Sequence, residues 1–375
     1  MERGFISPAI ANNLVQDVAD ALAVSQEICR ETVVPTEPKA TLGCQPEIAN
    51  VVEYPKKQLE RWLNLGSSHY QTGKYELALE AFKQAYTLSE AAGDGQGQGK
   101  ALSNIGLTFY SLRHYSKAVE YCHTALNFAN RAQDRHSAIK IFSTLGNAYR
   151  HLKEPDRAIG YQLQSLALAK ELDDRPGEMA ALNNLGLAYK AVGQYEQAIV
   201  YEEQGLVIAR EICDRQIEEQ ILKNLGNACY ALGNYTKAIA YYEQRLVVSK
   251  QLGDRRIQAQ ILRNLSNAYY AAGLYEQSIA CGHQRLEVAR SMEDLRGQEQ
   301  ALGTMAVAYD ALGDYANAIR FYKERLDLAR SMQDWRVEEQ VLGSLKVAYY
   351  AIGDYITAAE YAAERQNMMR RSVSV

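Results

Sequence analysis

The amino-acid sequence predicts an all-α protein, an α-solenoid of about eight helix-turn-helix units. Similar segments recur every 40 residues without an inserted residue, over about residues 59–370 of the 375-residue chain. Apolar residues within each segment follow the i, i+3, i+7 spacing of one helix face. Aspartate and glycine recur where helices begin and end. A period near 40 also occurs in β-propellers, but the helical spacing decides against a propeller.

Three series of residues define the period. The first series consists of small residues: Gly66, Gly106, Gly146, Gly186, Gly226, Ser266 and Ala306. The second series consists of tyrosines with a proline in its one gap: Tyr75, Tyr115, Pro155, Tyr195, Tyr235, Tyr275, Tyr315 and Tyr355. The third series is again small: Ala78, Ala118, Ala158, Ala198, Ala238, Ser278, Ala318 and Ala358. Eight copies of one structural unit are therefore expected.

Each unit is expected to contain two helices. The first helix should follow an aspartate whose side chain caps backbone N–H groups, at Asp94, Asp134, Asp174, Asp214, Asp254, Asp294 or Asp334. Its core-facing residues should be Trp62, Leu65, His69, Leu145, Leu182, Leu185, Leu222, Leu225, Cys229, Leu262 and Leu265. It should end at a turn with Gly73, Gly193, Gly233, Gly273, Gly313 or Gly353. The second helix should begin about two residues later, where Pro155 suits a first turn.

The spacing L-G-x-x-Y-x-x-x-G-x-Y-x-x-A is complete in residues 185–198 and resembles the tetratricopeptide repeat. The usual unit of that family has 34 residues. The longer repeat of this chain, for example in residues 241–279, is similar to that of the LGN and Pins adaptors. The resemblance implies a right-handed α-solenoid whose first helices line a concave groove, with the second helices outside. It also implies a scaffold or assembly adaptor that binds other proteins.

Composition and motifs argue against several other classes. The net charge is −4, the mean hydropathy is −0.34, and no apolar run approaches the ~20 residues of a spanning helix. Asp17 and Asp20 interrupt any secretory signal, so a cytoplasmic protein without membrane insertion is expected. The six cysteines lack Cys-x-x-Cys spacing and should be free thiols. No nucleotide loop or hydrolase motif occurs, and Cys122-His123 and Cys281-Gly-His283 have too few partners for a metal site. No enzymatic activity, cofactor or metal is expected.

Residues 1–55 are expected to form an N-terminal extension, and residues 56–375 the repeat superhelix. The extension holds five of the seven prolines, eight acids and three bases, so its net charge is −5 and that of the remainder is +1. A stripe from Ile10 to Leu22 predicts one amphipathic helix, followed by a proline-containing linker. This extension either caps the first repeat or folds back as an autoinhibitor into the groove. Its prolines and interspersed cations favour capping slightly.

In repeats two to six, the groove-facing stripe of the first helix is predicted to bind a partner. It carries six cations, several amides and tyrosines, and no acid. The candidate residues are Lys100, Asn104, Tyr110, Lys140, Asn147, Arg150, Asn184, Lys190, Lys223, Asn224, Asn227, Tyr230, Arg263, Asn264, Asn267 and Tyr270. Asparagine amides donate and accept hydrogen bonds, as an extended peptide backbone requires, while Lys and Arg select acidic side chains. The predicted ligand is therefore an extended acidic segment of a partner protein.

Several alternatives remain open. The asparagines could form hydrogen bonds between repeats, and the tyrosines could fill packing positions. Stacked repeats with tyrosines and cations could hold single-stranded RNA, although the asparagines repeat without the variation that a base-reading code needs, which makes nucleic acid the less favoured ligand. A further series, Arg245, Arg285, Arg325 and Arg365, is expected to lie along the repeat interfaces. These arginines should pair with acids such as Glu299 or Glu339.

Overall fold

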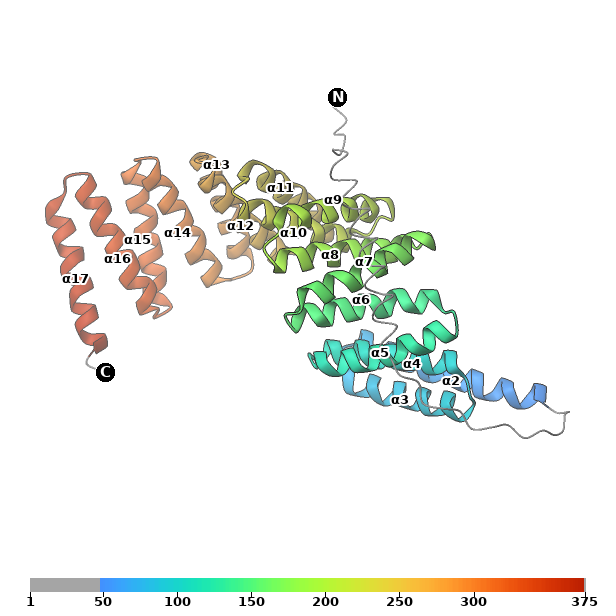
Figure 1. Ribbon diagram of the computed structural model, residues 1–375. Helices are drawn as coiled ribbons and strands as arrows, with labels where there is room; N and C mark the ends of the chain where they lie inside the picture. Colours follow the sequence, from blue (N-terminus) through green and yellow to red (C-terminus); the bar gives the residue numbers. More distant parts are fainter. Residues whose placement is uncertain (1–47, 374–375) are drawn as a thin grey trace, which may run out of the picture. The chain divides into compact units, whose positions relative to one another are not determined.

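The computed structural model describes residues 48–373, and the side chains of residues 56–370. The regular structure in this part of the chain is entirely α-helical, which confirms the predicted fold class (Figure 1). The sixteen helices are α2 (Ile48–Gln71), α3 (Tyr75–Ala91), α4 (Gly95–Ser111), α5 (Tyr115–Arg131), α6 (Arg135–His151), α7 (Pro155–Glu171), α8 (Arg175–Ala191), α9 (Tyr195–Glu211), α10 (Arg215–Ala231), α11 (Tyr235–Leu252), α12 (Arg255–Ala271), α13 (Tyr275–Ser291), α14 (Leu295–Ala311), α15 (Tyr315–Ser331), α16 (Trp335–Ala351) and α17 (Tyr355–Val373).

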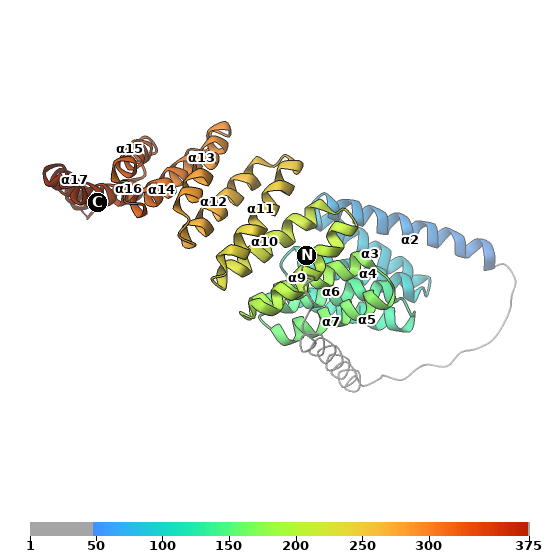
Figure 2. The same ribbon diagram turned by 90° about the horizontal axis from the view of Figure 1, so that it is seen from above.

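The helices form hairpins in chain order. The chain divides into an N-terminal unit that ends at Ile212 and a C-terminal unit that begins at Cys213. The N-terminal unit contains the hairpins from α2–α3 to α8–α9, and the C-terminal unit those from α10–α11 to α16–α17. Within each unit, every hairpin packs against the next, as the ribbon shows from above (Figure 2). In the N-terminal unit, α4, α6 and α8 lie side by side.

The predicted domain boundary at residues 55 and 56 stays a prediction. The first described helix, α2, already begins at Ile48. The predicted amphipathic helix from Ile10 to Leu22 lies outside the described residues. None of the helices within residues 48–373 combines the length and the hydropathy of a membrane-spanning segment.

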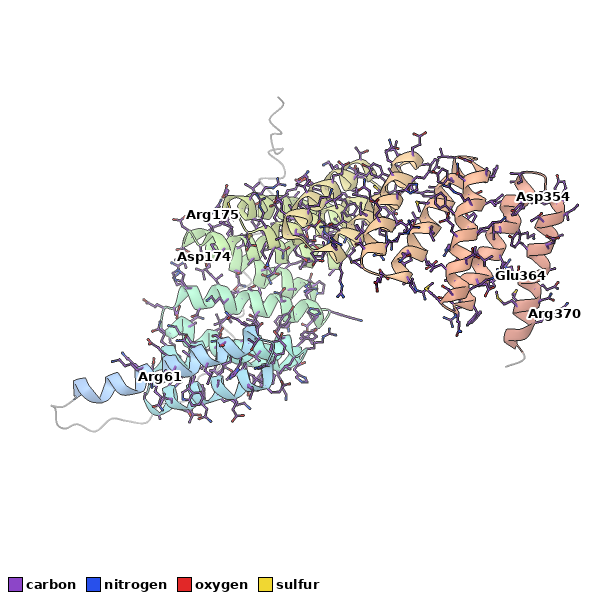
Figure 3. The ribbon with its side chains drawn as sticks, turned by 180° about the vertical axis from the view of Figure 1, so that it is seen from behind. Arg61, Asp174, Arg175, Asp354, Glu364 and Arg370 are labelled. Carbon is purple, nitrogen blue, oxygen red and sulfur yellow. The ribbon has the colours of Figure 1, made fainter. Side chains whose placement is uncertain are left out.

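The predicted helix starts are confirmed. Each aspartate of the 40-residue series accepts a hydrogen bond from the backbone N–H three residues later and so caps an even-numbered helix. In α10, for example, the Ile217 nitrogen lies 3.0 Å from Asp214 Oδ1. Asp174 and Arg175 mark the corresponding start of α8 (Figure 3). Pro155 is the first residue of α7, as expected.

The predicted turn glycines are confirmed as well. Gly73, Gly193, Gly233, Gly273, Gly313 and Gly353 all have φ between 73° and 85°. This left-handed conformation is easily adopted by glycine because it has no Cβ. A second left-handed series, not predicted, follows the odd-numbered helices at Gly93, Gln133, Asp173, Cys213, Gly253, Glu293 and Gln333.

Small residues allow the two helices of a hairpin to approach closely. A Cβ on Gly226 would lie 2.4 Å from a ring carbon of Tyr242, and one on Gly106 would lie 2.5 Å from Cys122 Sγ. Most predicted core leucines are fully buried, including Leu145, which packs among residues of the preceding hairpin. Leu65 was wrongly predicted to be buried: it is 43% exposed, because no hairpin precedes α2 among the described residues.

Candidate functional site

The predicted binding residues lie on even-numbered helices and form two sets, one in each unit. The set in the N-terminal unit comprises Lys100, Asn104 and Tyr110 on α4, Lys140, Asn147 and Arg150 on α6, and Asn184 and Lys190 on α8. The set in the C-terminal unit comprises Lys223, Asn224, Asn227 and Tyr230 on α10, and Arg263, Asn264, Asn267 and Tyr270 on α12.

In the N-terminal set, two of the three lysines are more accessible than the amides, and Lys190 is half-buried like them. Lys100 and Lys140 are exposed, whereas Asn104 and Asn147 are half-buried. Asn184 Nδ2 donates a hydrogen bond to Ser143 Oγ at 3.0 Å, which joins α8 to α6. Hydrogen bonding between repeats, the alternative left open for the asparagines, therefore holds at Asn184.

Tyr110 and Arg150 belong to a cluster around His151. The ring of His151 stacks on Tyr115 with centroids 4.5 Å apart, and its Nε2 atom lies 3.3 Å from both Tyr110 Oη and Arg150 Nη2. Burial and the neighbouring cations Arg150 and Arg113 lower the pKa of His151. Burial raises the pKa of Tyr110. The sequence pattern did not indicate His151, because this residue ends α6 only and does not recur in the other repeats.

In the C-terminal set, the residues on α10 are engaged with their own neighbours. Lys223 Nζ donates to Gln220 Oε1 at 2.8 Å. Asn224 is only 3% exposed, and Asn227 Oδ1 accepts a hydrogen bond from Tyr242 Oη at 2.8 Å. Burial raises the pKa of Tyr242 to about 12, so this phenol keeps its donor proton at neutral pH. These contacts give the amides of α10 a role in packing.

The tyrosines pack across the turn within each hairpin. The ring of Tyr230 lies 5.3 Å from that of Tyr235, and the ring of Tyr270 lies 5.2 Å from that of Tyr275. Both helix-terminal tyrosines still expose part of their surface. The packing alternative therefore accounts for part of each ring, and the exposed part remains available for a ligand.

On α12, three of the four predicted residues border an open pocket of about 410 Å³, and Asn264 is not in its lining. Arg263, Asn267 and Tyr270 line it from α12, together with two arginines of the interface series, Arg285 and Arg325. Residues of α14 and α16 complete the lining: Gln300, Gly303, Thr304, Val307 and Gln340. Sequence reasoning missed the contribution of α14, because its groove-facing segment is nearly uncharged.

Three arginines of the interface series pair with acids, as predicted, whereas Arg285 donates to the neutral side chain of Gln300. Arg325 Nε donates to Glu299 Oε1 at 2.7 Å, and Arg365 pairs with Glu339. Arg245 Nε donates to Glu219 Oε1, also at 2.7 Å. The acid lies 26 residues before its arginine in each case, on the preceding helix of the same hairpin.

The cysteine-histidine pairs are ordinary parts of odd-numbered helices. Burial raises the pKa of the Cys122 thiol to about 12 and that of Cys281 to about 11, so neither is a thiolate near pH 7. His123 Nε2 lies 3.1 Å from Tyr149 Oη. Within the described part of the chain, no three metal-binding side chains cluster together.

Three solved structures show the same fold at low sequence identity. A Signal Transduction ATPase with Numerous Domains from Pyrococcus horikoshii, which has a tetratricopeptide repeat sensor, is 19% identical, with a TM-score of 0.59 over 85% of this chain. The apo form of RapI is 14% identical, with a TM-score of 0.52 over 74% of this chain and 99% of its own. BtubC (BKLC) from P. vanneervenii is 21% identical, with a TM-score of 0.50 over 63% of this chain and 92% of its own.

This chain spans 46% of the length of the Pyrococcus protein. No curated protein matches its sequence. The tetratricopeptide repeat family matches residues 58–131, 137–211, 217–291 and 259–331, which together make up more than half of the chain. The chain therefore belongs to the tetratricopeptide repeat family.

Proposed function

We propose that the protein is a scaffold or assembly adaptor that binds an extended acidic segment of a partner protein along the first helices of its repeats. One observation carries this proposal. The predicted stripe on the first helices of repeats two to six has six cations and no acid, in a chain with more acids than bases. Tetratricopeptide repeats generally serve as protein-interaction modules, and stacked repeats present extended surfaces for such binding. The resemblance to LGN and Pins that the sequence pattern suggests favours an adaptor.

The accessible cations are the main contacts in this proposal. Lys100, Lys140 and Arg263 are exposed, whereas Asn184 and Asn224 are partly committed to neighbouring side chains. Positive charges on adjacent helices attract an acidic segment over a distance of about one Debye length, ~8 Å at physiological salt. Exposed amides and tyrosines then contact the peptide backbone and its apolar side chains.

The proposal includes no catalytic step and no cofactor. The raised pKa values of the buried thiols support a non-enzymatic role, because a thiol nucleophile must ionise to react. The proposed location is the cytoplasm, in keeping with cysteines that lack a disulfide framework.

A synthetic acidic peptide tests the proposal in the full-length protein. The probe is a fluorescent 12-residue peptide of alternating Glu and Ser, and its control alternates Gln and Ser. Replacing Lys100, Lys140 and Lys190 with Ala should weaken binding of the acidic peptide about tenfold, if each charge contributes about 0.5 kcal/mol. Fluorescence anisotropy at two salt concentrations measures the affinity.

The matched control replaces Lys117, Lys153 and Lys170, which are exposed, and should leave the affinity unchanged. Equal losses in the two triple variants, or equal affinity for the two peptides, would contradict the proposal. If oligouridine binds more tightly than the acidic peptide, with a steep salt dependence, the protein is an RNA binder instead. Affinity purification with mass spectrometry then identifies the natural partner.

A further inference from the structure

One hairpin of the C-terminal unit breaks the pattern of arginine–glutamate ion pairs. The hairpins α10–α11, α14–α15 and α16–α17 each pair an arginine with a glutamate 26 residues earlier. In α12–α13 the arginine is Arg285, but Ala259 occupies the glutamate position. Arg285 is only 6% exposed, and its Nη2 atom donates to the neutral Gln300 Oε1 at 2.6 Å.

On α12, Arg263 occupies the position at which the next two hairpins have a glycine. A Cβ on Gly303 would lie 3.0 Å from the guanidinium of Arg325, and one on Gly343 would lie 3.2 Å from that of Arg365. The equivalent residue of α12 is Arg263. Glycine leaves room for the neighbouring arginine, whereas Arg263 adds a positive charge beside Arg285.

The two arginines lack a carboxylate of their own. Among residues 56–370, no carboxylate oxygen lies within 4.0 Å of Arg263 or Arg285. Asp294 and Glu299 act on Arg285 only from farther away, and burial and Arg263 outweigh them and lower its pKa. Glu299 already pairs with Arg325 and Arg296.

The pocket that borders α12 makes the positive charges of Arg263 and Arg285 accessible. Arg263, Arg285 and Arg325 all line the opening of about 410 Å³, and none of its lining residues is acidic. A buried guanidinium without a carboxylate is electrostatically costly, and its planar donors match the two oxygens of a carboxylate. Asn267 and Thr304, also in the lining, provide neutral hydrogen-bonding groups for the adjacent backbone.

We propose that this pocket binds an Asp or Glu side chain of the partner's extended segment, with Arg285 as its bidentate ligand and Arg263 as the second cation. The bound carboxylate takes the role that Glu219, Glu299 and Glu339 have in the other hairpins. Acidic residues are thereby selected at one defined position. This proposal depends on the proposed function for the nature of its ligand, but its site is separate from the lysines tested above.

Two substitutions test the pocket with the Glu–Ser and Gln–Ser peptides: one removes the positive charge, and the other adds an internal carboxylate. Arg285→Gln removes the charge and should weaken binding of the Glu–Ser peptide at least about tenfold, with no loss of melting temperature. Ala259→Glu restores the internal partner, so it should raise the melting temperature and also weaken binding about tenfold. Both variants should bind the Gln–Ser peptide as the wild-type protein does.

Controls of the same type are available in the chain. Ala259→Gln is neutral and should retain the wild-type affinity. Arg365→Gln removes an arginine of the same series outside the pocket and should also retain it. If Arg285→Gln does not fold, Ala259→Glu decides the question, because it leaves Arg285 in place.

The outcomes separate the two proposals. Wild-type affinity in Arg285→Gln and Ala259→Glu, together with weaker binding in the lysine triple variant, would overturn the pocket and leave the proposed function standing. Equal affinity of the wild-type protein for the Glu–Ser and Gln–Ser peptides would overturn both.

Discussion

The ion pair of Arg245 and Glu219 shows how a buried charge depends on a single partner. Arg245 is 1% exposed, and its Nε and Nη2 atoms lie 2.7 and 2.6 Å from the same oxygen of Glu219. Its Nη1 atom has no hydrogen-bond partner in the described part of the chain. Desolvation of both groups offsets most of their attraction, so the pair adds little net stability while the loss of one member is expensive.

We expect Glu219→Ala to lower the free energy of unfolding by about 3–5 kcal/mol, because it leaves the buried guanidinium without its carboxylate. The double variant Glu219→Met with Arg245→Met should recover most of this loss, because it removes both charges. Urea unfolding followed by circular dichroism measures both values. A loss below about 1 kcal/mol in the single variant would show that water reaches Arg245.

The helices themselves were predictable from local chemistry. Aspartate precedes every first helix from α4 to α16, and glycine lies in most of the following turns. Both residue types have direct structural causes at these places, so their repetition locates the helix ends. The second turn series was missed because only Gly93 and Gly253 carry glycine there. Gln133, Cys213 and others adopt the same left-handed φ. Because non-glycine residues hold this conformation in most of these turns, single residues do not reveal it.

The caps at the start of α15 and α17 predict an acid-sensitive contribution to stability. Asp354 lies at the start of α17 (Figure 3). It accepts hydrogen bonds from Thr357 Oγ1 and the Thr357 backbone nitrogen, at 2.8 and 3.1 Å, and these bonds lower its pKa. The side chain and backbone of Asn317 lower the pKa of Asp314 in the same way. Because both folded-state values lie below the ordinary value near 4, the stabilisation is present above that pH and is lost as pH falls through the folded pKa.

We expect Asp314→Asn with Asp354→Asn to keep the caps and lose this pH dependence. Asn234 already caps α11, with its Oδ1 atom 3.2 Å from the Lys237 nitrogen. The urea midpoint of the double variant should therefore fall less than that of the wild-type protein between pH 6 and pH 3. Equal falls in the two proteins would contradict the assignment of these carboxylates.

For the whole molecule, the sequence places the candidate residues on particular helices but does not show which of them already bond to neighbouring side chains. The 40-residue period places the cations and amides on the first helices, and the structure confirms those helices. It does not reveal that Asn184 bonds to Ser143, because that contact joins different repeats. Arg285 was assigned to the interface series, since the absence of its glutamate is visible only once the 26-residue spacing of the ion pairs is known.

The N-terminal end of the repeat array bears on the role of the extension. Leu65 on α2 and Leu77 on α3 are 43% and 51% exposed, so the first described hairpin presents apolar surface. Terminal repeats need a polar outer face to remain soluble, and the sequence stripe from Ile10 to Leu22 is apolar enough to cover such a surface. Capping is therefore favoured over occupation of the binding face by the acidic extension.

We expect deletion of residues 1–47, which stops before α2, to lower the melting temperature and leave the affinity for the Glu–Ser peptide unchanged. Leu14→Ser with Leu22→Ser in the full-length chain should lower the melting temperature in the same direction, because it removes the apolar stripe without changing the length or charge. Autoinhibition makes the opposite prediction for the deletion, since loss of a tethered competitor raises the apparent affinity. Tighter peptide binding with an unchanged melting temperature would thus exclude the cap and show that the extension competes with the partner.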